Sequence, residues 1–228
     1  RSYKEKDASY FFGRSSEIET LYESVLNNRL TIVYGPSGTG KTSILRAGVF
    51  PKLRTQKYFP VYVKLRHNFN EDNELEDVSY LKQIIDTFKK VSIERNYEIE
   101  QVIPYTKKDN CQSLWEYFHC NRFWTSDDFP LYPILVLDQF EEIFTLTDAR
   151  KGKEHVQTFF SQLADLCEDW IPEYIRTHIS DNIVDYPVAA NYRCIISLRE
   201  DFLARLEEQT LKYPSFRLNR FGLQPLNE

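Results

Sequence analysis

The stretch from Gly35 to Thr42 constrains this chain more than any other. It reads Gly-Pro-Ser-Gly-Thr-Gly-Lys-Thr and lies between the apolar run Leu30–Tyr34 and a helix-like segment that begins at Ser43. The order strand, glycine-rich turn, helix is the setting in which backbone N–H groups converge on a phosphate. The sequence therefore predicts a phosphate-binding loop (P-loop) at the start of a helix.

Each residue type in this loop has a physical task. Glycines let consecutive N–H groups turn inward, and the following helix adds the positive end of its dipole. Lys41 carries a point charge that reaches the β- and γ-phosphates, and Thr42 offers a hydroxyl to Mg²⁺. We therefore expect a nucleoside triphosphate and Mg²⁺ as cofactors. The expected nucleotide-binding residues of the loop are Gly35, Pro36, Ser37, Gly38, Thr39, Gly40, Lys41, Thr42 and Ser43.

Strand-like and helix-like segments alternate along the chain, which predicts an α/β fold. The expected architecture is a three-layer α/β/α sandwich of the P-loop NTPase type, with a mostly parallel sheet of about five strands. The predicted strands are residues 30–34, 58–65, 132–137, 194–198 and 221–226. The predicted helices are residues 16–26, 43–53, 78–88, 113–120, 153–170 and 201–209. Residues 171–191 contain two prolines and are interpreted as a connection.

The composition excludes several classes of protein. The 228 residues carry a net charge of −5 with acids and bases interspersed, which argues against nucleic acid as the main partner. No apolar run has membrane length, and no signal peptide opens the chain, so we expect a cytoplasmic protein without a membrane partner. No internal break divides residues 1–228, so we expect one domain. Because the chain opens at Arg1 without a methionine, we expect a fragment of a longer multidomain protein.

Asp138 ends a second apolar run, Ile134–Leu137. A P-loop enzyme needs a carboxylate that holds Mg²⁺ through water, and the carboxyl ends of parallel strands meet at one edge of the sheet. We therefore interpret Asp138 and Thr42 as the metal-binding pair, and expect the strand of Asp138 to lie beside the strand of the P-loop. The alternative is an ordinary turn residue at the end of a strand.

Two glutamates follow this aspartate. Side chains alternate along an extended segment, so a strand that continued beyond Asp138 would place Asp138, Phe140 and Glu142 on one face. This geometry favours Glu142 as the general base that orients the attacking water. Glu141 would serve instead if the chain turned into a helix early. The alternative is that both glutamates merely favour a helix N-terminus electrostatically.

Arg199 is a further catalytic candidate, beside the two glutamates and Lys41. It follows the apolar run Cys194–Leu198 and should emerge at the same edge as Asp138. An arginine there can sense the γ-phosphate and stabilise charge in the transition state. The alternative is an ion pair with Glu200 or Asp201.

The run Thr106–Asp109 matches the short guanine-reading pattern of GTPases. It precedes Asp138, whereas GTPases place this pattern after the magnesium aspartate, and Asp138 is followed by Gln139 rather than by the Asp-x-x-Gly switch. ATP is therefore the expected nucleotide.

Four motifs in order resemble one family. They are Phe11-Phe-Gly-Arg14, the P-loop continuing to Gly48 and Pro51, the acidic box Leu137–Phe144, and the run Ile196–Phe202. Together they resemble the STAND class of signalling ATPases, most closely the novel STAND NTPase 1 group, which is related to NACHT and AAA+ modules. The resemblance covers nearly the whole chain and is weakest over residues 66–130.

The resemblance implies roles that the residues alone do not. Arg14 would lie near the adenine and phosphates, and the catalytic glutamate would stand four residues after the magnesium aspartate, at Glu142. STAND proteins are switches in which ADP holds a closed monomer and ATP favours self-association. The resemblance further implies effector and sensor domains outside this chain.

The leading hypothesis is thus a slow, regulatory ATP hydrolase that acts in signal transduction, in bacterial defence or stress response. Two alternatives belong to other classes: a DNA-acting AAA+ initiator-like ATPase, and a non-catalytic nucleotide-binding scaffold.

Overall fold

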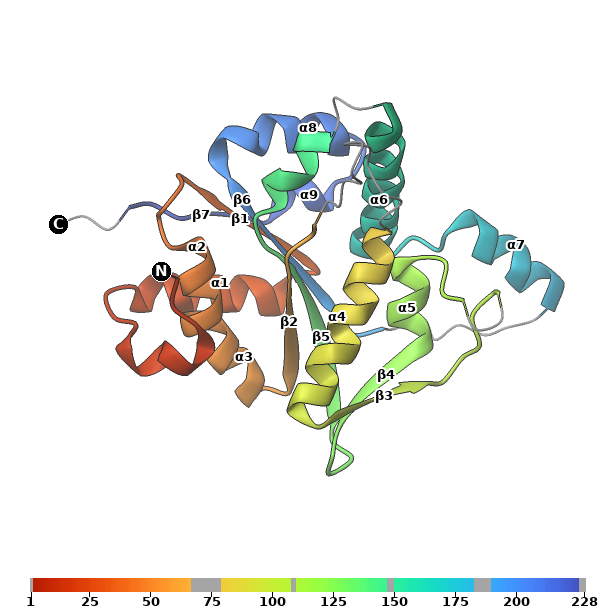
Figure 1. The fold of residues 1–228 in the computed structure, drawn as a ribbon, viewed down its shortest axis with the longest axis horizontal. Helices are drawn as coiled ribbons and strands as arrows, with labels where there is room; N and C mark the ends of the chain where they lie inside the picture. Colours follow the sequence, from red (N-terminus) through yellow and green to blue (C-terminus); the bar gives the residue numbers. More distant parts are fainter. Residues whose placement is uncertain (1, 67–78, 108–109, 147–149, 183–189, 226–228) are drawn as a thin grey trace, which may run out of the picture.

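A computed structural model describes residues 2–66, 79–107, 110–146, 150–182 and 190–225. Within these ranges the strands form one seven-stranded sheet. Its centre is five parallel strands in the order β2-β5-β6-β1-β7 (Figure 1). Their bounds are β1 Leu30–Gly35, β2 Tyr58–Val63, β5 Pro130–Leu137, β6 Arg193–Arg199 and β7 Arg220–Gly222. The predicted α/β fold with a mostly parallel sheet is confirmed.

An antiparallel extension continues the sheet at one edge. β3 (Tyr97–Gln101) pairs with β4 (Asn121–Thr125), and β4 pairs with the first residues of β5. The sequence analysis did not predict these two strands. β3 exposes Glu98 and Glu100 and only half-buries Tyr97 and Ile99, so it lacks the strong apolar run that marks the central strands.

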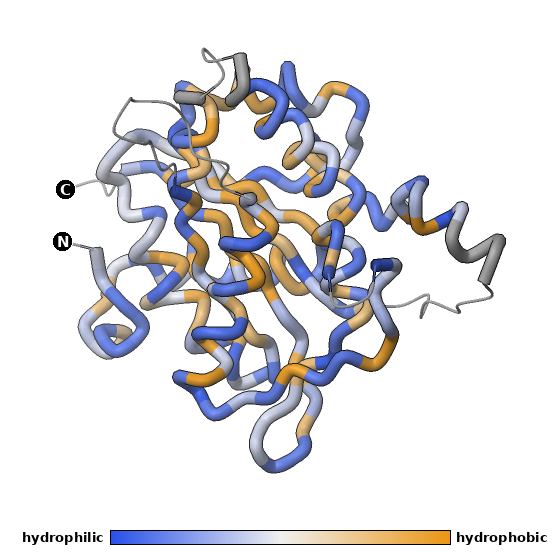
Figure 2. The backbone as a smooth tube through the Cα atoms, turned by 45° about the vertical axis from the view of Figure 1, so that its right-hand side comes forward, coloured by the Kyte–Doolittle hydropathy of each residue, from blue (hydrophilic) through white to orange (hydrophobic). Residues whose placement is uncertain are grey.

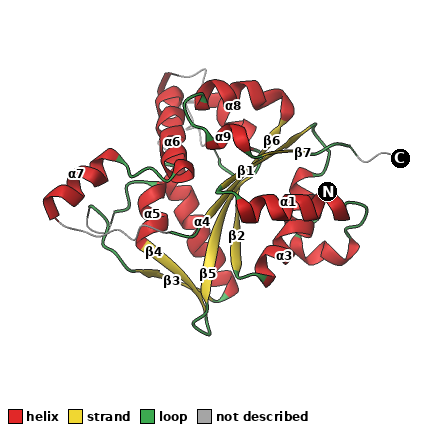
Figure 3. Ribbon diagram, turned by 180° about the vertical axis from the view of Figure 1, so that it is seen from behind, coloured by secondary structure: helices red, strands yellow, loops and turns green. Residues whose placement is uncertain are grey.

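Helices cover both faces of the sheet (Figure 3), and the strands between them are largely apolar (Figure 2). Both faces must be apolar because side chains alternate along a strand: in β5, Ile134 and Val136 pack on one face, and Leu135 and Leu137 pack on the other. The first face carries α1 Ser15–Asn27, the π-helical η2 Ile44–Val49 and α3 Phe50–Thr55. The second carries α4 Tyr80–Arg95, α5 Leu114–Cys120, α6 Arg150–Glu168, α8 Leu203–Thr210 and α9 Ser215–Leu218.

The remaining elements are short or peripheral. They are η1 Glu5–Tyr10, α2 Lys41–Ser43, η3 Phe140–Leu146, α7 Glu173–Asn182 and η4 Glu200–Phe202. The prediction of a connection over residues 171–191 is wrong for its first half, which is α7. This helix starts immediately after Pro172, a residue that cannot continue a helix but is tolerated where one begins.

One predicted neighbour relationship is also wrong. β6, not β5, lies beside β1, so the strand of Asp138 is one place removed from the strand of the P-loop. Local patterns mark strands without specifying their order, which the crossover connections determine. Among the helices of the described ranges, none is both long and apolar enough to cross a membrane.

Candidate nucleotide-binding site

The P-loop leaves the carboxyl end of β1 and enters the short helix α2. Gly38 and Gly40 have φ angles of +80° and +90°, which side chains rarely adopt. Gly35 has a different reason to lack a side chain: a Cβ there would stand 2.2 Å from the carbonyl oxygen of Leu223. The glycines of the loop therefore serve two purposes, a left-handed backbone and a close approach to the end of β7.

Lys41 and Thr39 are held by the loop itself. The Lys41 ammonium donates to the carbonyl oxygens of Gly35 and Pro36, both at 2.8 Å, and the Thr39 hydroxyl donates to Pro36 O at 2.9 Å. Burial lowers the pKa of Lys41, against the opposing influence of the Glu141 and Asp138 carboxylates. Lys41 thus stands at the loop within electrostatic range of the carboxylates of Glu141, Asp138 and Glu200.

Asp138 and Thr42 meet although their strand and helix are separated by β6. The Thr42 hydroxyl donates to Asp138 Oδ2 at 2.6 Å, and Asp138 is 3% exposed. A hydroxyl and a carboxylate are the hard oxygen ligands that Mg²⁺ prefers. The residues present therefore fit Mg²⁺.

These groups line one cavity of about 290 Å³. Loop, acidic box and β6 all contribute to its walls, as expected for a ligand site at the carboxyl edge of a parallel sheet. The lining residues are Ser2, Ser37, Gly38, Gly40, Lys41, Thr42, Ser43, Asp138, Gln139, Glu141, Ser197 and Arg199.

The chain after Asp138 does not remain extended, so the geometry that favoured Glu142 is absent. β5 ends at Leu137, Gln139 has a φ of +55°, and the 3₁₀-helix η3 begins at Phe140. Glu141 consequently lines the cavity, and burial raises its pKa. Glu142 forms an ion pair with Lys64 at 3.0 Å and is not among the residues that line the cavity.

Arg199 reaches the cavity, as expected from its place after β6, but its guanidinium is also paired. It binds both carboxylate oxygens of Asp201 at 3.0 and 2.8 Å, the alternative considered from sequence. Its backbone N–H donates to Glu141 Oε2 at 3.3 Å. The ends of β5 and β6 are therefore linked through Glu141.

Arg14 is not among the residues that line the cavity, but it holds the P-loop through a hydrogen bond to its backbone. This arginine is 4% exposed; its guanidinium donates to Glu17 and to the carbonyl oxygens of Thr39 and Gln224. The Ser43 hydroxyl accepts a hydrogen bond from the N–H of Tyr3, which ties the N-terminal segment to the same helix start.

Sequence reasoning missed Tyr62, Ser197 and Lys64. Tyr62 donates to Asp138 Oδ2 at 2.9 Å. Ser197 is fully buried, lines the cavity, and its hydroxyl has no hydrogen-bond partner within the described ranges. The signal for Ser197 was a lone polar residue inside the apolar run Cys194–Leu198, since buried polar groups usually have a partner or a task.

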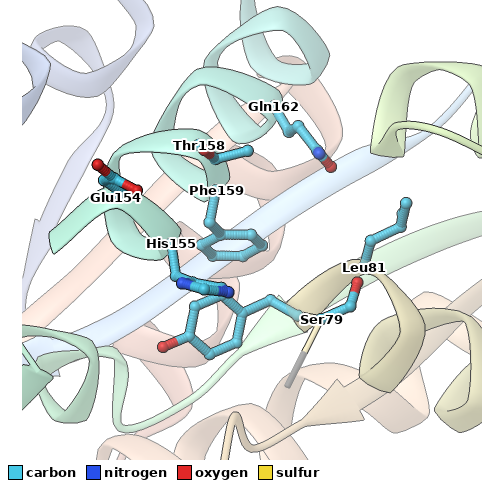
Figure 4. Close-up of a pocket in the computed structure, with 8 residues that line it drawn as sticks. Ser79, Leu81, Glu154, His155, Thr158, Phe159 and Gln162 are labelled. Atoms are coloured by element: carbon cyan, nitrogen blue, oxygen red, sulfur yellow. The ribbon is translucent and has the colours of Figure 1, made fainter. Parts of the chain in front are cut away.

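A second cavity, of about 320 Å³, lies between the start of α4 and α6 (Figure 4). Its walls include Ser79, His155, Phe159 and Gln162, and none of the predicted site residues. Convergent chemistry rather than size therefore identifies the first cavity as the candidate site. Lys108 and Asp109 of the guanine-reading pattern lie outside the described residues.

Comparisons with known proteins place the chain in a family. The sequence profile of the family described as Novel STAND NTPase 1 matches residues 1–228. An uncharacterized ATP-binding protein of Methanocaldococcus jannaschii is 30% identical over 91 residues, which is 39% of this chain and 24% of that protein. This chain therefore spans about a quarter of the length of the curated relative.

One solved structure shows the same fold at low identity. A Walker-type ATPase of Pyrococcus abyssi matches 100% of this chain and 57% of its own, with a TM-score of 0.55 and 17% identity. The ORC2 protein of Aeropyrum pernix, in complexes with ADPNP and ADP, matches 94% of this chain and 48% of its own, with a TM-score of 0.49 and 13% identity.

Proposed function

We propose that this chain, which belongs to the Novel STAND NTPase 1 family, is an ATP-binding, Mg²⁺-dependent regulatory ATPase. The observation that carries the proposal is the contact of Thr42 with Asp138 at 2.6 Å, in a cavity that Lys41 and Glu141 also line. The loop N–H groups that would bind phosphate, the Lys41 ammonium and the oxygen ligands for Mg²⁺ thereby lie around one cavity, which is the arrangement that phosphoryl transfer requires.

Each group then has a separate task. Loop N–H groups and Lys41 bind the β- and γ-phosphates, and Thr42 and Asp138 hold Mg²⁺, which neutralises developing charge when bound. Lys41 exchanges its contacts with Gly35 O and Pro36 O for phosphate oxygens. Arg199 contacts the γ-phosphate once its guanidinium leaves Asp201.

Glu141 is our candidate for the residue that orients the attacking water. It faces the cavity, is influenced electrostatically by Lys41, and has a pKa raised by burial, which makes it a stronger base than an exposed glutamate. Glu142, favoured by the family pattern, pairs with Lys64 instead. The two residues are adjacent and chemically identical, so each is the matched control for the other.

Single-turnover ATP hydrolysis of Glu141→Gln and Glu142→Gln tests the assignment. We expect Glu141→Gln to slow hydrolysis by roughly 100-fold or more, the range of a lost general base, with ATP still bound. Glu142→Gln should stay within about 3-fold of the unchanged chain, since it loses only a half-exposed ion pair. The reverse pattern would transfer the role to Glu142.

Lys41→Ala supplies the binding arm of the experiment. We expect this variant to lose measurable ATP binding in calorimetry, because the cation nearest the loop is removed. Bound ATP without hydrolysis in the unchanged chain would favour the non-catalytic scaffold. Unchanged ATP affinity in Lys41→Ala would refute the site itself.

The biological output we propose is a nucleotide-controlled switch, in which ATP and ADP favour different association states in signal transduction. Family membership supports this, since STAND proteins are signalling switches. Light scattering of the full-length protein with ADP and with ATP tests it; equal masses in both would contradict it.

A further inference from the structure

Tyr62 touches the candidate metal site from a strand that no sequence motif marks. It lies near the end of β2, opposite Val136 of β5. Its hydroxyl donates to Asp138 Oδ2 at 2.9 Å, the same oxygen that accepts from Thr42 at 2.6 Å. One carboxylate oxygen therefore accepts two hydrogen bonds, one from the P-loop helix and one from β2, the edge strand of the parallel part of the sheet.

Two donors fix a carboxylate in a way that one cannot. A carboxylate held by a single hydrogen bond still rotates about its terminal bond, whereas donors from two directions restrain its plane. The Thr42 hydroxyl has one proton and two lone pairs, so donating to Asp138 leaves lone pairs for a cation. The restraint from Tyr62 would then hold the Asp138 carboxylate in one orientation for such a cation.

Tyr62 is itself held in place. The guanidinium of Arg46, one turn beyond the P-loop lysine, lies over the Tyr62 ring at 4.8 Å from its centroid. The backbone adds a second tie, because the N–H of Asp138 donates to the carbonyl oxygen of Val63 at 3.1 Å. Burial, with the Asp138 carboxylate beside it, raises the pKa of Tyr62, so its hydroxyl stays protonated and remains a donor.

We propose that Tyr62 is a positioning residue for the Mg²⁺ site: its hydroxyl orients Asp138 and thereby sets the affinity of the nucleotide complex for the metal. This inference rests on the proposed function. It gives β2 a role in the site, because Tyr62 belongs neither to the P-loop nor to the acidic box. Residues that orient a metal ligand typically change metal affinity 10- to 100-fold when they are removed.

The test compares Tyr62→Phe with Tyr58→Phe. Tyr58 lies four residues earlier on β2, packs against the same face, and contacts the ring of Tyr132. Both substitutions remove one phenolic hydroxyl from the same strand, but Tyr58 lies about 13 Å from Tyr62 along the chain. ADP affinity is measured by calorimetry twice, with EDTA and with excess Mg²⁺. Direct Mn²⁺ binding to the ADP complex, followed by electron paramagnetic resonance, gives a second readout.

We expect Tyr62→Phe to bind ADP in EDTA within about 2-fold of the unchanged chain and to lose about 10-fold in affinity for Mn²⁺ and in the gain from Mg²⁺. Tyr58→Phe should retain both. Equal metal dependence in the two variants would overturn the proposal, as would tighter metal binding in Tyr62→Phe. The proposal would also be overturned if Tyr62→Phe lost as much ADP affinity in EDTA as in excess Mg²⁺, because that loss would indicate a general structural role for Tyr62.

Two further results separate this proposal from the proposed function. If the unchanged chain binds ADP without any effect of Mg²⁺, the proposed function fails and the role of Tyr62 fails with it. If Tyr62→Phe does not fold, Arg46→Leu removes the cation over the ring and keeps the hydroxyl. It should weaken Mn²⁺ binding in the same direction by about 3-fold; unchanged Mn²⁺ affinity in Arg46→Leu would overturn the proposal.

Discussion

Gly35 is the loop residue for which the structure predicts the largest effect of adding one methyl group. It ends β1, and the segment after β7 passes directly over it. The N–H of Leu223 donates to Tyr34 O at 2.7 Å, and Leu223 itself is fully buried. A Cβ on residue 35 would stand 2.2 Å from Leu223 O. The contact is with backbone, so no side-chain rotation relieves it.

The cost of Gly35→Ala follows from this geometry. A carbon and a carbonyl oxygen approach no closer than about 3.3 Å, so the two segments must separate by about 1 Å. That shift breaks the Leu223–Tyr34 hydrogen bond, which is worth about 1 kcal/mol, and adds overpacking strain of about 1–3 kcal/mol. We expect Gly35→Ala to lower the free energy of unfolding by about 2–4 kcal/mol.

Urea unfolding followed by circular dichroism measures this change. With a slope of about 3 kcal/mol per M for a chain of this size, the midpoint should fall by about 1 M. Gly38→Ala is the control: a Cβ there meets nothing within 4 Å, and only its left-handed φ costs about 1 kcal/mol. If Gly35→Ala costs no more than Gly38→Ala, the close approach to Leu223 is not what requires a glycine at position 35.

Three more predictions concern stability. Arg14→Met should lower the free energy of unfolding by about 2–3 kcal/mol and weaken ADP binding, because Thr39 O and Gln224 O lose a buried charged donor; unchanged urea midpoints and ADP affinity would contradict this. Burial alone would raise the pKa of Asp169, but the hydrogen bond from His119 and the charge of Arg29 lower it, so Asp169→Asn should destabilise the fold above pH 4 and less as the pH falls further. Burial raises the pKa of Asp165 to about 6, so Asp165→Asn should stabilise the fold at pH 7 and have no effect below pH 4; urea midpoints across this range check both signs.

The elements that sequence predicted well are those whose hydrophobic pattern is strong and local. The buried strands at 30–34, 132–137 and 194–198 are apolar because both of their faces are covered. β3 and β4 lack such a pattern. β3 is held instead by pairing with β4 and by packing of Tyr97 on Phe59, and contacts between residues distant in sequence leave no local signal. The neighbour of the P-loop strand was mispredicted for the same reason: it is β6 rather than β5.

In the candidate site, too, the residues with a local sequence signal were predicted, and those that depend on distant contacts or on backbone conformation were not. Motif spacing brought attention to Lys41, Thr42, Asp138 and Arg199, and the structure gathers all four around one cavity. Tyr62 carried no signal, because a tyrosine in an alternating strand is ordinary until its partner is known. Which of the two glutamates lines the cavity depends on the left-handed backbone conformation of Gln139, and a glutamine in the sequence does not predict that conformation.

The ion pair between Arg199 and Asp201 does not prevent Arg199 from binding a phosphate. The two side chains are 45% and 52% exposed. Such exposed pairs contribute about 0–1 kcal/mol, whereas a hydrogen bond to a charged group contributes about 1.5–3 kcal/mol. Arg199 therefore gains more from a phosphate in the cavity than it loses by leaving Asp201.

The same arithmetic applies to Lys64 and Glu142, which are 40% and 39% exposed, so their ion pair alone does not keep Glu142 from the cavity. The backbone does. In a 3₁₀-helix successive side chains point about 120° apart, so adjacent residues of η3 cannot face the same side. With Phe140 buried and Glu141 at the cavity, bringing Glu142 to the site requires η3 to rotate or unwind. The two glutamates are therefore alternatives, and the hydrolysis rates of their glutamine variants should differ sharply rather than share the loss.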